Sequence, residues 1–415
     1  MKVLLPTLGS AGDIHPFLAI GRAAQARGHE VEVMTNPVFA DMVQHAGLKF
    51  YPVGTATHYA DAMKSPKLWH SIDGFGVLWR RMARYAVEPV YHRIAHHSAH
   101  GACVVLATPL IFGARLANEK LKVPLVTAYT AATMLRSCEN PLTMAHWRIP
   151  RWIPKTVRAA AWAALDKYKL DPMVAGDLPM VRLRLGLLPI NQSIFGQWVH
   201  SPQAGVTLFP AWFASSPVDW PRQVRQAGFP LYNGDAARGL DTDLSRFLDV
   251  GDPPVVFTPG SAMGHGHAFF KAAVRSCLEL GRRGVLLSTD ASQIPSDLPP
   301  TIHHCAYAPF SLLLHRAAAL VHHGGIGNSA QALRAGLPQL LTPMGFDQFD
   351  NAMRLEYLGV AACVKRHDPL YADMTLRLGE LLGSEQVASA CRDAAKKVMQ
   401  DRALESICDV LEAAK

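Results

Sequence analysis

The chain has 415 residues, which is enough for two or three domains of ordinary size, each with its own core. Hydrophobic residues make up 49% of it and charged residues 18%, a composition that excludes a disordered chain and a coiled coil. The net charge of +8 favours anionic partners such as phosphates, nucleic acid or a membrane surface, but it does not choose among them.

The cysteines and the hydropathy of the sequence indicate the cellular compartment in which the protein is expected. The seven cysteines form no CxxC pair, so they indicate neither a disulfide framework nor a zinc ribbon, and they suit a reducing environment. The chain begins with a strand-like segment, and we expect no export signal and no transmembrane helix. We expect a cytoplasmic protein, with peripheral association at the inner face of the membrane left open. No nucleic-acid partner is expected, because no binding module is recognisable.

Short apolar runs alternate with helix-like stretches along the chain, which is the pattern of a doubly wound parallel sheet. In the first half the predicted strands are Lys2–Thr7, Glu30–Thr35, Cys103–Ala107, Pro124–Ala128 and Gly205–Phe209. In the second half they are Pro254–Thr258, Gly284–Ser288, Thr301–Ala306, Ala319–His322, Gln339–Thr342 and Val360–Val364. The sequence therefore predicts an α/β fold with two Rossmann-like units in tandem.

Prolines divide the two series of strands. They recur between Phe209 and Gly234, where they remove backbone donors and disfavour both helix and strand. We therefore predict a first domain at residues 1–209, a linker at 210–234 and a second domain at 235–384. The tail, residues 385–415, is helical in composition and is expected to pack back towards the first domain.

An aromatic and basic insertion spans Trp147–Lys169. Its rings are Trp147, Trp152, Trp162 and Tyr168, and its cations are Arg148, Arg151, Lys155, Arg158, Lys167 and Lys169. The favoured interpretation is a surface helix whose rings pack on the domain. Lipid contact is an alternative, because interfacial helices combine Trp with Lys and Arg, and an apolar acceptor pocket is another.

The first predicted strand leads into a turn, Gly9-Ser10-Ala11-Gly12-Asp13-Ile14-His15, and then a helix. Its glycines do not make GxGxxG, which disfavours a hydride-transferring oxidoreductase. The turn places Asp13 and His15 at the carboxyl edge of the sheet, where open α/β sheets bind ligands, and either can accept a proton from a hydroxyl. Asp13 is equally suited to capping the helix, so spacing leaves both roles open.

A second turn, His322-His323-Gly324-Gly325-Ile326-Gly327-Asn328, joins another strand to a helix. Its backbone N–H groups and the positive helix end suit a phosphate or pyrophosphate, and a histidine there can donate a hydrogen bond to a phosphate oxygen. A tight turn without a ligand explains the pattern equally well. Thr258-Pro259-Gly260-Ser261 offers a hydroxyl and further amides, and two such turns suit a nucleotide diphosphate.

Several of these residues resemble the nucleotide-sugar signature of the GT-B glycosyltransferases that use UDP- or dTDP-sugars. The signature residues are Tyr307-Ala308-Pro309, the second glycine turn, Gly336-Leu337-Pro338, Pro343, Asp347-Gln348 and Asn351-Ala352. Segments such as Phe75–Trp79, Gln197–Gln203 and Leu208–Ala214 are similar to the catalytic rhamnosyltransferases of rhamnolipid biosynthesis. That likeness extends over nearly the whole sequence.

The resemblance implies two Rossmann-like domains facing a central cleft, with the acceptor on the first and the nucleotide-sugar donor on the second. It makes Asp13 the catalytic base, with His15 as its neighbour. The donor-binding residues that it implies are Gly12, Ser261, Tyr307, Ala308, His323, Gly325, Gly327, Asn328, Gln331, Asp347 and Gln348. Among these, His323 would bind the pyrophosphate, Tyr307 would stack on the base, and Asp347 with Gln348 would bind sugar hydroxyls.

Gln331 departs from the family pattern, since the plant members carry a Glu there that holds the ribose hydroxyls. An amide is a weaker acceptor for two hydroxyls, so UDP and dTDP both stay open, with a lean towards deoxyribose. No DxD pair lies at the end of a predicted strand, where it could hold a metal ion, and we expect no metal and no cofactor. His92, His96 and His100 would share one helix face, but without an acidic partner a solvated face is favoured over zinc.

The preferred function is an inverting, metal-independent transfer of rhamnose from dTDP-rhamnose to a hydroxyl of an apolar lipid acceptor such as a hydroxyalkanoyloxyalkanoate. The apolar residues around Met134, Leu135, Leu142 and Met144 suit such an acceptor. An alternative in the same class is a UDP-glucose-dependent transferase acting on a small aromatic or sterol-like alcohol. From other classes, a non-catalytic nucleotide-sugar-binding protein and a sugar-phosphate epimerase are the alternatives.

Overall fold

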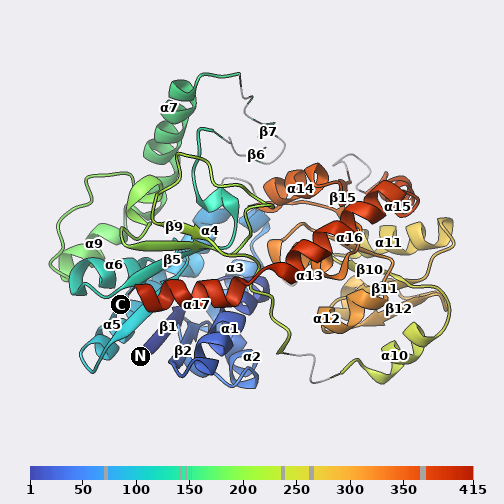
Figure 1. Ribbon diagram of the computed structural model, residues 1–415, viewed down its shortest axis with the longest axis horizontal. Helices are drawn as coiled ribbons and strands as arrows, with labels where there is room; N and C mark the ends of the chain where they lie inside the picture. The colour runs from blue at the N-terminus through green and yellow to red at the C-terminus, as the bar shows by residue number, and fades with distance from the viewer. Residues whose placement is uncertain are drawn as a thin grey trace. The chain divides into compact units, whose positions relative to one another are not determined.

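The computed structural model describes residues 1–69, 73–139, 143–144, 147–148, 150, 152–234, 239–260, 266–364 and 371–414. The chain folds into two compact units (Figure 1). The first unit contains Met1–Pro230 with Arg402–Lys415, and the second contains Leu231–Asp401. Each is built on a twisted parallel sheet with helices, as the sequence predicts.

The first unit carries a parallel sheet in the order β3-β2-β1-β4-β5-β8-β9. Its strands are β1 (Lys2–Pro6), β2 (Glu30–Thr35), β3 (Lys49–Pro52), β4 (Cys103–Ala107), β5 (Leu125–Tyr129), β8 (Ala204–Thr207) and β9 (Val224–Gln226). Its helices are α1 (Ala11–Ala26), α2 (Ala40–His45), α3 (Ala56–Met63), α4 (Asp73–Arg81), α5 (Val87–Ser98), α6 (Phe112–Leu121), α7 (Lys155–Leu165), α8 (Asp171–Val174), α9 (Leu178–Arg184) and α17 (Ala403–Ala413). A short antiparallel pair, β6 (Thr143–Met144) and β7 (Trp147–Arg148), precedes α7.

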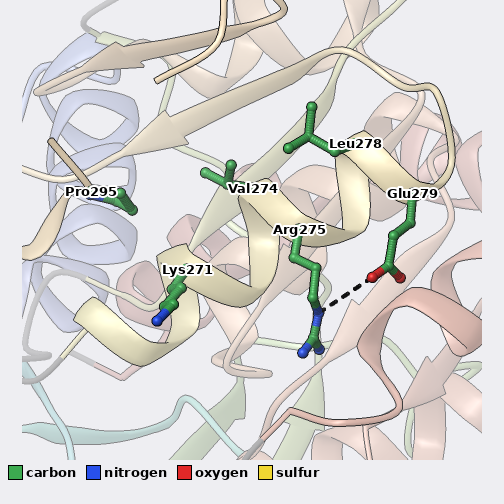
Figure 2. Close-up of a pocket in the computed structure, with 6 residues that line it drawn as sticks. All are labelled: Lys271, Val274, Arg275, Leu278, Glu279 and Pro295. Atoms are coloured by element: carbon green, nitrogen blue, oxygen red, sulfur yellow. Dashed lines mark ion pairs between the residues drawn. The ribbon is translucent and has the colours of Figure 1, made fainter. Parts of the chain in front are cut away.

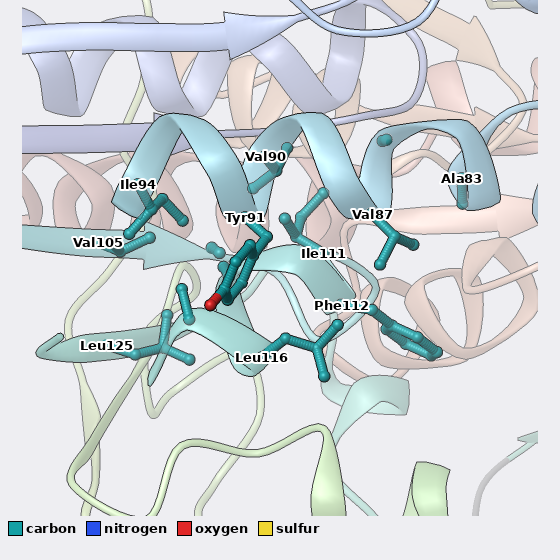
Figure 3. Close-up of a cluster of buried hydrophobic side chains, with 14 of the residues drawn as sticks. Ala83, Val87, Val90, Tyr91, Ile94, Val105, Ile111, Phe112, Leu116 and Leu125 are labelled. Atoms are coloured by element: carbon teal, nitrogen blue, oxygen red, sulfur yellow. The ribbon is translucent and has the colours of Figure 1, made fainter. Parts of the chain in front are cut away.

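Helix α5 shows how the sequence produces the core of this unit. Its apolar residues recur at helical spacing, so one stripe of the helix faces the sheet and α6. Val90, Tyr91 and Ile94 are buried there against Val105 and Leu125 (Figure 3). Each such side chain contributes roughly 1.5–3 kcal/mol when it is fully buried.

The second unit carries a parallel sheet in the order β12-β11-β10-β13-β14-β15. Its strands are β10 (Val255–Thr258), β11 (Gly284–Leu287), β12 (Ile302–Cys305), β13 (Ala319–His322), β14 (Gln339–Leu341) and β15 (Ala361–Cys363). Its helices are α10 (Thr242–Asp249), α11 (His267–Glu279), α12 (Phe310–Leu313), α13 (Ile326–Ala335), α14 (Gln348–Tyr357), α15 (Met374–Leu382) and α16 (Glu385–Gln400).

Strand order places the predicted turns at special positions in both sheets. In the first sheet β1 pairs with β2 on one side and β4 on the other, so the order reverses there. In the second sheet β10 pairs in the same way with β11 and β13. Open α/β sheets bind ligands outside the carboxyl ends of strands at such a switch point. The turns that follow β1, β10 and β13 are those that the sequence singles out.

The domain boundaries differ from the sequence prediction. The first unit runs on to Pro230, because β9 lies inside the predicted linker and pairs with β8. The tail divides between the units, since α16 belongs to the second and α17 to the first. In the first unit α17 packs on α1, where Arg27 donates to the Asp409 carboxylate at 2.7 Å. A three-residue, partly polar strand such as β9 has too little pattern to predict.

The insertion only partly follows the prediction of a helix with packed rings. Helix α7 forms, followed by a π-helical turn at Asp166–Leu170, but Trp152 is 81% and Tyr168 is 67% exposed. Trp162 is covered by the Arg136 guanidinium, 4.9 Å from the ring centroid. Leu142 and Arg151 lie outside the described residues, as do the side chains of Met144, Trp147 and Arg148. Within the described residues, every helix is too short or too polar to cross a bilayer.

Candidate active site

Asp13 lies in the first turn of α1 and performs the capping role that its position allows. Its Oδ2 accepts hydrogen bonds from the Ser10 backbone N–H at 2.8 Å and from the Ser10 hydroxyl at 3.1 Å. The carboxylate folds over Gly9, where a Cβ would lie 2.2 Å from Oδ2. Gly9 has φ +134°, so the turn needs a glycine there. Oδ1 accepts no hydrogen bond from the described residues, which leaves one oxygen available to a ligand.

Burial affects proton binding at this turn. It raises the pKa of the Asp13 carboxyl, and the hydrogen bonds from Ser10 oppose that shift. Burial and the Asp13 charge raise the pKa of Tyr59 to about 12, so the Tyr59 hydroxyl stays protonated. His15 is half-buried two residues further along α1, and side chains at this spacing do not face each other. The Asp13 and His15 side chains therefore do not face each other. Gly12 is exposed in the same turn.

The turn after β13 ends in an uncapped helix. Gly325 is the N-cap residue of α13, and it has no side chain to accept from the first amides. The N–H groups of Ile326, Gly327 and Asn328 follow it, and N–H groups of a first helical turn have no partner within the helix. Such an end carries a partial positive charge. The turn can therefore bind an anion through backbone amides, with no lysine or arginine.

His323 is held between two glycines of this region. A Cβ on Gly260 would lie 2.6 Å from the imidazole Cε1, and one on Gly325 would lie 2.5 Å from Nε2. Nδ1 is buried and accepts or donates no hydrogen bond within the described residues. Burial lowers the pKa of His323 to about 4, so the ring is neutral near pH 7. It offers a neutral N–H to a ligand, without the positive charge of an imidazolium.

His322 has a structural role that differs from the role of His323. It is fully buried, with Nδ1 accepting from the Gly324 N–H at 3.1 Å, so Nε2 carries the proton and donates to Gln339 Oε1 at 3.0 Å. Burial lowers its pKa to about 3. His322 therefore anchors the turn to β14, while His323 stays available.

The start of α14 brings Asp347 and Gln348 to the same turn. Gln348 is buried, and its Oε1 accepts from the Met344 and Gly345 N–H groups at 2.8 and 3.2 Å. That oxygen is therefore committed to its own loop and not to a sugar. Asn351 was not predicted as a site residue, although it belongs to the signature. Its Nδ2 donates to Gly324 O at 3.0 Å and to Asp347 Oδ2 at 2.8 Å.

The other predicted donor residues are more dispersed. Tyr307 follows β12 and is 48% exposed, whereas Ala308 is buried. Gln331, on α13, donates through Nε2 to the Tyr232 carbonyl at 3.2 Å. Ser261 lies outside the described residues. The structure thus gathers His323, Asp347 and the first turn of α13 around one loop, and it ties Gln331 to the segment at Tyr232.

The proteins similar to this chain include glycosyltransferases, as two relatives and one solved structure show. The O-mycaminosyltylonolide 6-deoxyallosyltransferase of Streptomyces fradiae is 28% identical, over 94% of this chain and 96% of the relative. The vancomycin aglycone glucosyltransferase of Amycolatopsis orientalis is also 28% identical, over 94% of this chain and 92% of the relative. The structure of spinosyn rhamnosyltransferase SpnG complexed with thymidine diphosphate has a TM-score of 0.68, at 20% identity, covering 99% of this chain and 100% of that one.

Two family models match opposite ends of the chain. Residues 3–138 match a glycosyltransferase family 28 N-terminal domain. Residues 283–411 match the C-terminal domain of the erythromycin biosynthesis protein CIII-like family. The chain is a nucleotide-sugar glycosyltransferase of the GT-B type. The first model covers the turn with Asp13, and the second covers the turn with His323 and the start of α14.

Two other features of this GT-B glycosyltransferase lie apart from the predicted site. A shallow hollow of about 400 Å³ lies along α11, and none of its lining residues is a predicted site residue (Figure 2). Its lining residues are Lys271, Val274, Arg275, Leu278, Glu279 and Pro295. His92, His96 and His100 are exposed on or just beyond α5, and the described residues contain no cluster of metal-ligating side chains.

Proposed function

We propose that this GT-B glycosyltransferase moves rhamnose from dTDP-rhamnose to a hydroxyl of an apolar lipid acceptor, such as a hydroxyalkanoyloxyalkanoate. The observation that carries the proposal is the uncapped end of α13 beside the buried, neutral ring of His323. Backbone amides and an imidazole N–H suit the diphosphate of a nucleotide sugar. The similarity to the catalytic rhamnosyltransferases of rhamnolipid biosynthesis supports the choice of sugar and acceptor.

In the proposed reaction, the second unit stabilises the diphosphate leaving group. When the bond between the anomeric carbon and the diphosphate oxygen breaks, negative charge grows on that oxygen. Fixed dipoles at the end of α13 stabilise this charge without reorganising during the reaction. The neutral His323 adds one hydrogen bond, and Asp347 binds a hydroxyl of the sugar.

Asp13 supplies the acceptor half of the reaction. The acceptor hydroxyl gives its proton to the free Oδ1 of Asp13 while its oxygen attacks the anomeric carbon. The diphosphate leaves with the bonding electrons, so the products are the glycoside, dTDP and a proton that Asp13 later releases. One displacement inverts the anomeric centre. The scheme uses no enzyme nucleophile, no metal and no cofactor.

Substitutions at Asp13 and Ser10 separate the two roles of Asp13, catalytic base and helix cap. Asp13→Asn keeps an oxygen that accepts from the Ser10 N–H, so we expect the fold and dTDP affinity to persist. Because the base is lost, kcat should fall roughly 10²- to 10⁴-fold. Ser10→Ala is the matched control, since it removes a hydroxyl bonded to the same carboxylate and leaves the base. Undiminished transfer by Asp13→Asn would show that the base is assigned to the wrong residue.

A donor screen tests the sugar. We expect transfer from dTDP-rhamnose, with UDP-glucose a poor donor. Transfer from UDP-glucose alone would favour the glucosyltransferase alternative. That alternative is the main rival because a vancomycin aglycone glucosyltransferase is among the relatives. Donor binding without transfer to any hydroxyl acceptor would favour a non-catalytic binding protein, and donor isomerisation without an acceptor would favour an epimerase.

A further inference from the structure

Helix α7 buries a single side chain, and that side chain is a cation. Arg158 is 5% exposed, whereas its neighbours along the helix, such as Val157 at 53%, are exposed. A surface helix ordinarily buries an apolar stripe and leaves its charges in water. The buried face of α7 therefore requires a specific explanation.

The segment after β5 runs along this buried face of α7. Arg136 covers the ring of Trp162 and pairs with Asp166, two turns beyond Arg158. At the other end, Glu139 pairs with Lys155, in the first turn of α7. Along the helix, Arg158 lies between these two contacts, and it is the one residue of α7 that is buried.

The pKa of Cys138 places the Arg158 charge in the same region. Burial and the Asp219 carboxylate raise the pKa of the Cys138 thiol, and the positive charge of Arg158 lowers it. The charge of Arg158 therefore acts on Cys138, which lies in the chain between Arg136 and Glu139.

The guanidinium of Arg158 is incompletely paired. Its Nε and Nη1 are buried and have no hydrogen-bond partner among the described residues. The surrounding carboxylates have other partners. Asp219 accepts from the Ser137 hydroxyl and the Cys138 N–H at 2.8 and 2.5 Å, and Asp166 accepts from Ser193 at 2.6 Å as well as from Arg136.

A second buried arginine in the same unit shows what ordinary pairing looks like. Arg182 is 3% exposed, and its Nη1 and Nη2 each donate to the Glu119 carboxylate at 2.8 Å. Its Nε donates to the Leu188 carbonyl at 2.8 Å. A buried charge without such partners destabilises a fold, so its retention at Arg158 points to an anion that arrives from outside.

We propose that Arg158 binds a carboxylate of the sugar acceptor and so selects acidic lipids over neutral ones. The inference rests on the proposed function, which supplies a hydroxylated lipid acceptor with a free carboxylate. A carboxylate accepts strong, charge-assisted hydrogen bonds from a guanidinium, and Nε and Nη1 of Arg158 are two donors that the described residues leave unpaired.

The position of Arg158 fits an extended acceptor. The segment that covers it follows β5, and Asp13 follows β1 at the same edge of the same sheet. β5 is two strands away from β1, which is a lateral separation of about 9.6 Å. For its hydroxyl to meet Asp13 and its carboxylate to meet Arg158, an acceptor would need an extended chain between the two groups.

The experiment compares one acceptor with and without its charge. A hydroxyalkanoyloxyalkanoate and its methyl ester differ at the carboxylate alone. We expect the wild type to prefer the free acid by roughly 10- to 100-fold in kcat/KM, mainly through KM. Arg158→Met should bring this ratio close to one and leave transfer to the ester and dTDP affinity unchanged. Arg158→Lys, which keeps the charge, should restore part of the preference.

Thermal unfolding without acceptor gives an independent readout. Arg158→Met removes an unpaired buried charge, so its Tm should stay the same or rise. Arg182→Met is the matched control, and its Tm should fall because the Glu119 carboxylate loses the arginine that neutralises it. A fall in Tm for Arg158→Met, with equal loss on acid and ester, would assign Arg158 a structural role and overturn the proposal.

Failure of the proposed function would give a different result. The wild type would then transfer sugar to neither the acid nor the ester. In that case, calorimetric titration of the free acid into the wild type and into Arg158→Met still tests the carboxylate site. Equal affinities for the two proteins would contradict it.

Discussion

His323 and Gly260 are in such close contact that a Cβ at position 260 would lie 2.6 Å from the imidazole. Gly260 also has φ +98°, which L side chains rarely adopt. The turn after β10 therefore determines where the ring after β13 lies. The order of the sheet reverses at these two strands, and this contact brings their two loops together at the candidate site.

Replacing Gly260 should therefore impair donor binding without touching the imidazole. We expect Gly260→Ala to weaken dTDP binding roughly tenfold or more, close to the effect of His323→Ala, because the ring must move. Isothermal titration with dTDP measures this. Gly281→Ala is the control for backbone strain alone, since Gly281 has φ +61° and no atom within 4 Å of its Cβ position. Wild-type affinity in Gly260→Ala would contradict the contact.

We expect Asn351 to affect donor binding by holding the turn in place and not by contacting the sugar. Asn351→Ala leaves the Gly324 carbonyl and the Asp347 carboxylate without their shared donor, which should cost about 1–3 kcal/mol of unfolding free energy. We expect weaker binding of dTDP itself. Asp347→Ala, in contrast, should weaken dTDP-rhamnose and leave dTDP nearly unchanged. Titrations with both ligands separate the two residues, and equal dTDP affinity for Asn351→Ala and wild type would refute the role in the turn.

Because three histidine side chains have lowered pKa values in the folded protein, we expect the free energy of unfolding to fall at acidic pH. Burial lowers the pKa of His200 to about 4, of His322 to about 3 and of His323 to about 4, from 6.5 in the unfolded chain. Between these values the unfolded chain binds more protons, so stability is lost as pH falls. Each imidazole contributes about 1.4 kcal/mol per pH unit.

Denaturant titrations from pH 7 to pH 5 measure this loss, and His200→Gln should reduce its slope by about one proton. The amide can still bond to the Tyr129 hydroxyl, which contacts His200 Nδ1 at 2.9 Å. His96→Gln is the control, because His96 is exposed. An unchanged slope in His200→Gln would show that this imidazole titrates alike in both states.

The sequence pattern predicts the sheets well but misses the two edge strands of the first sheet. Every strand predicted from an apolar run forms, within a residue or two at each end. The pattern does not predict β3 and β9, and both are edge strands with few buried side chains. Because neither β3 nor β9 has a fully buried side chain, their sequences carry little of the apolar signal.

At the candidate site, local chemistry was predictable and long-range pairing was not. The glycine turns and their position after strands follow from spacing alone. The commitment of Gln348 Oε1 to its own loop and the bridge made by Asn351 depend on how that loop folds back. The unpaired state of Arg158 depends on residues far along the sequence, and no local pattern distinguishes it from the paired Arg182.

Gln331 should decide between donors through the sugar of the nucleotide. A carboxylate accepts from both hydroxyls of ribose, whereas deoxyribose offers one fewer, so Gln331→Glu should shift the ratio of UDP to dTDP affinity towards UDP. We expect a shift of roughly tenfold. Competition titrations with UDP and dTDP measure it.

The substitution has a second consequence that must be separated from the first. Glu cannot donate to the Tyr232 carbonyl, so Gln331→Glu also loosens the segment that α13 holds. Arg334→Ala is the matched control, because Arg334 ties the same segment through Asn233 Oδ1 at 2.6 Å and leaves Gln331 intact. If loosening alone mattered, both variants would weaken UDP and dTDP equally. A shifted ratio in Gln331→Glu, absent from Arg334→Ala, assigns nucleotide choice to position 331, and an unchanged ratio removes it.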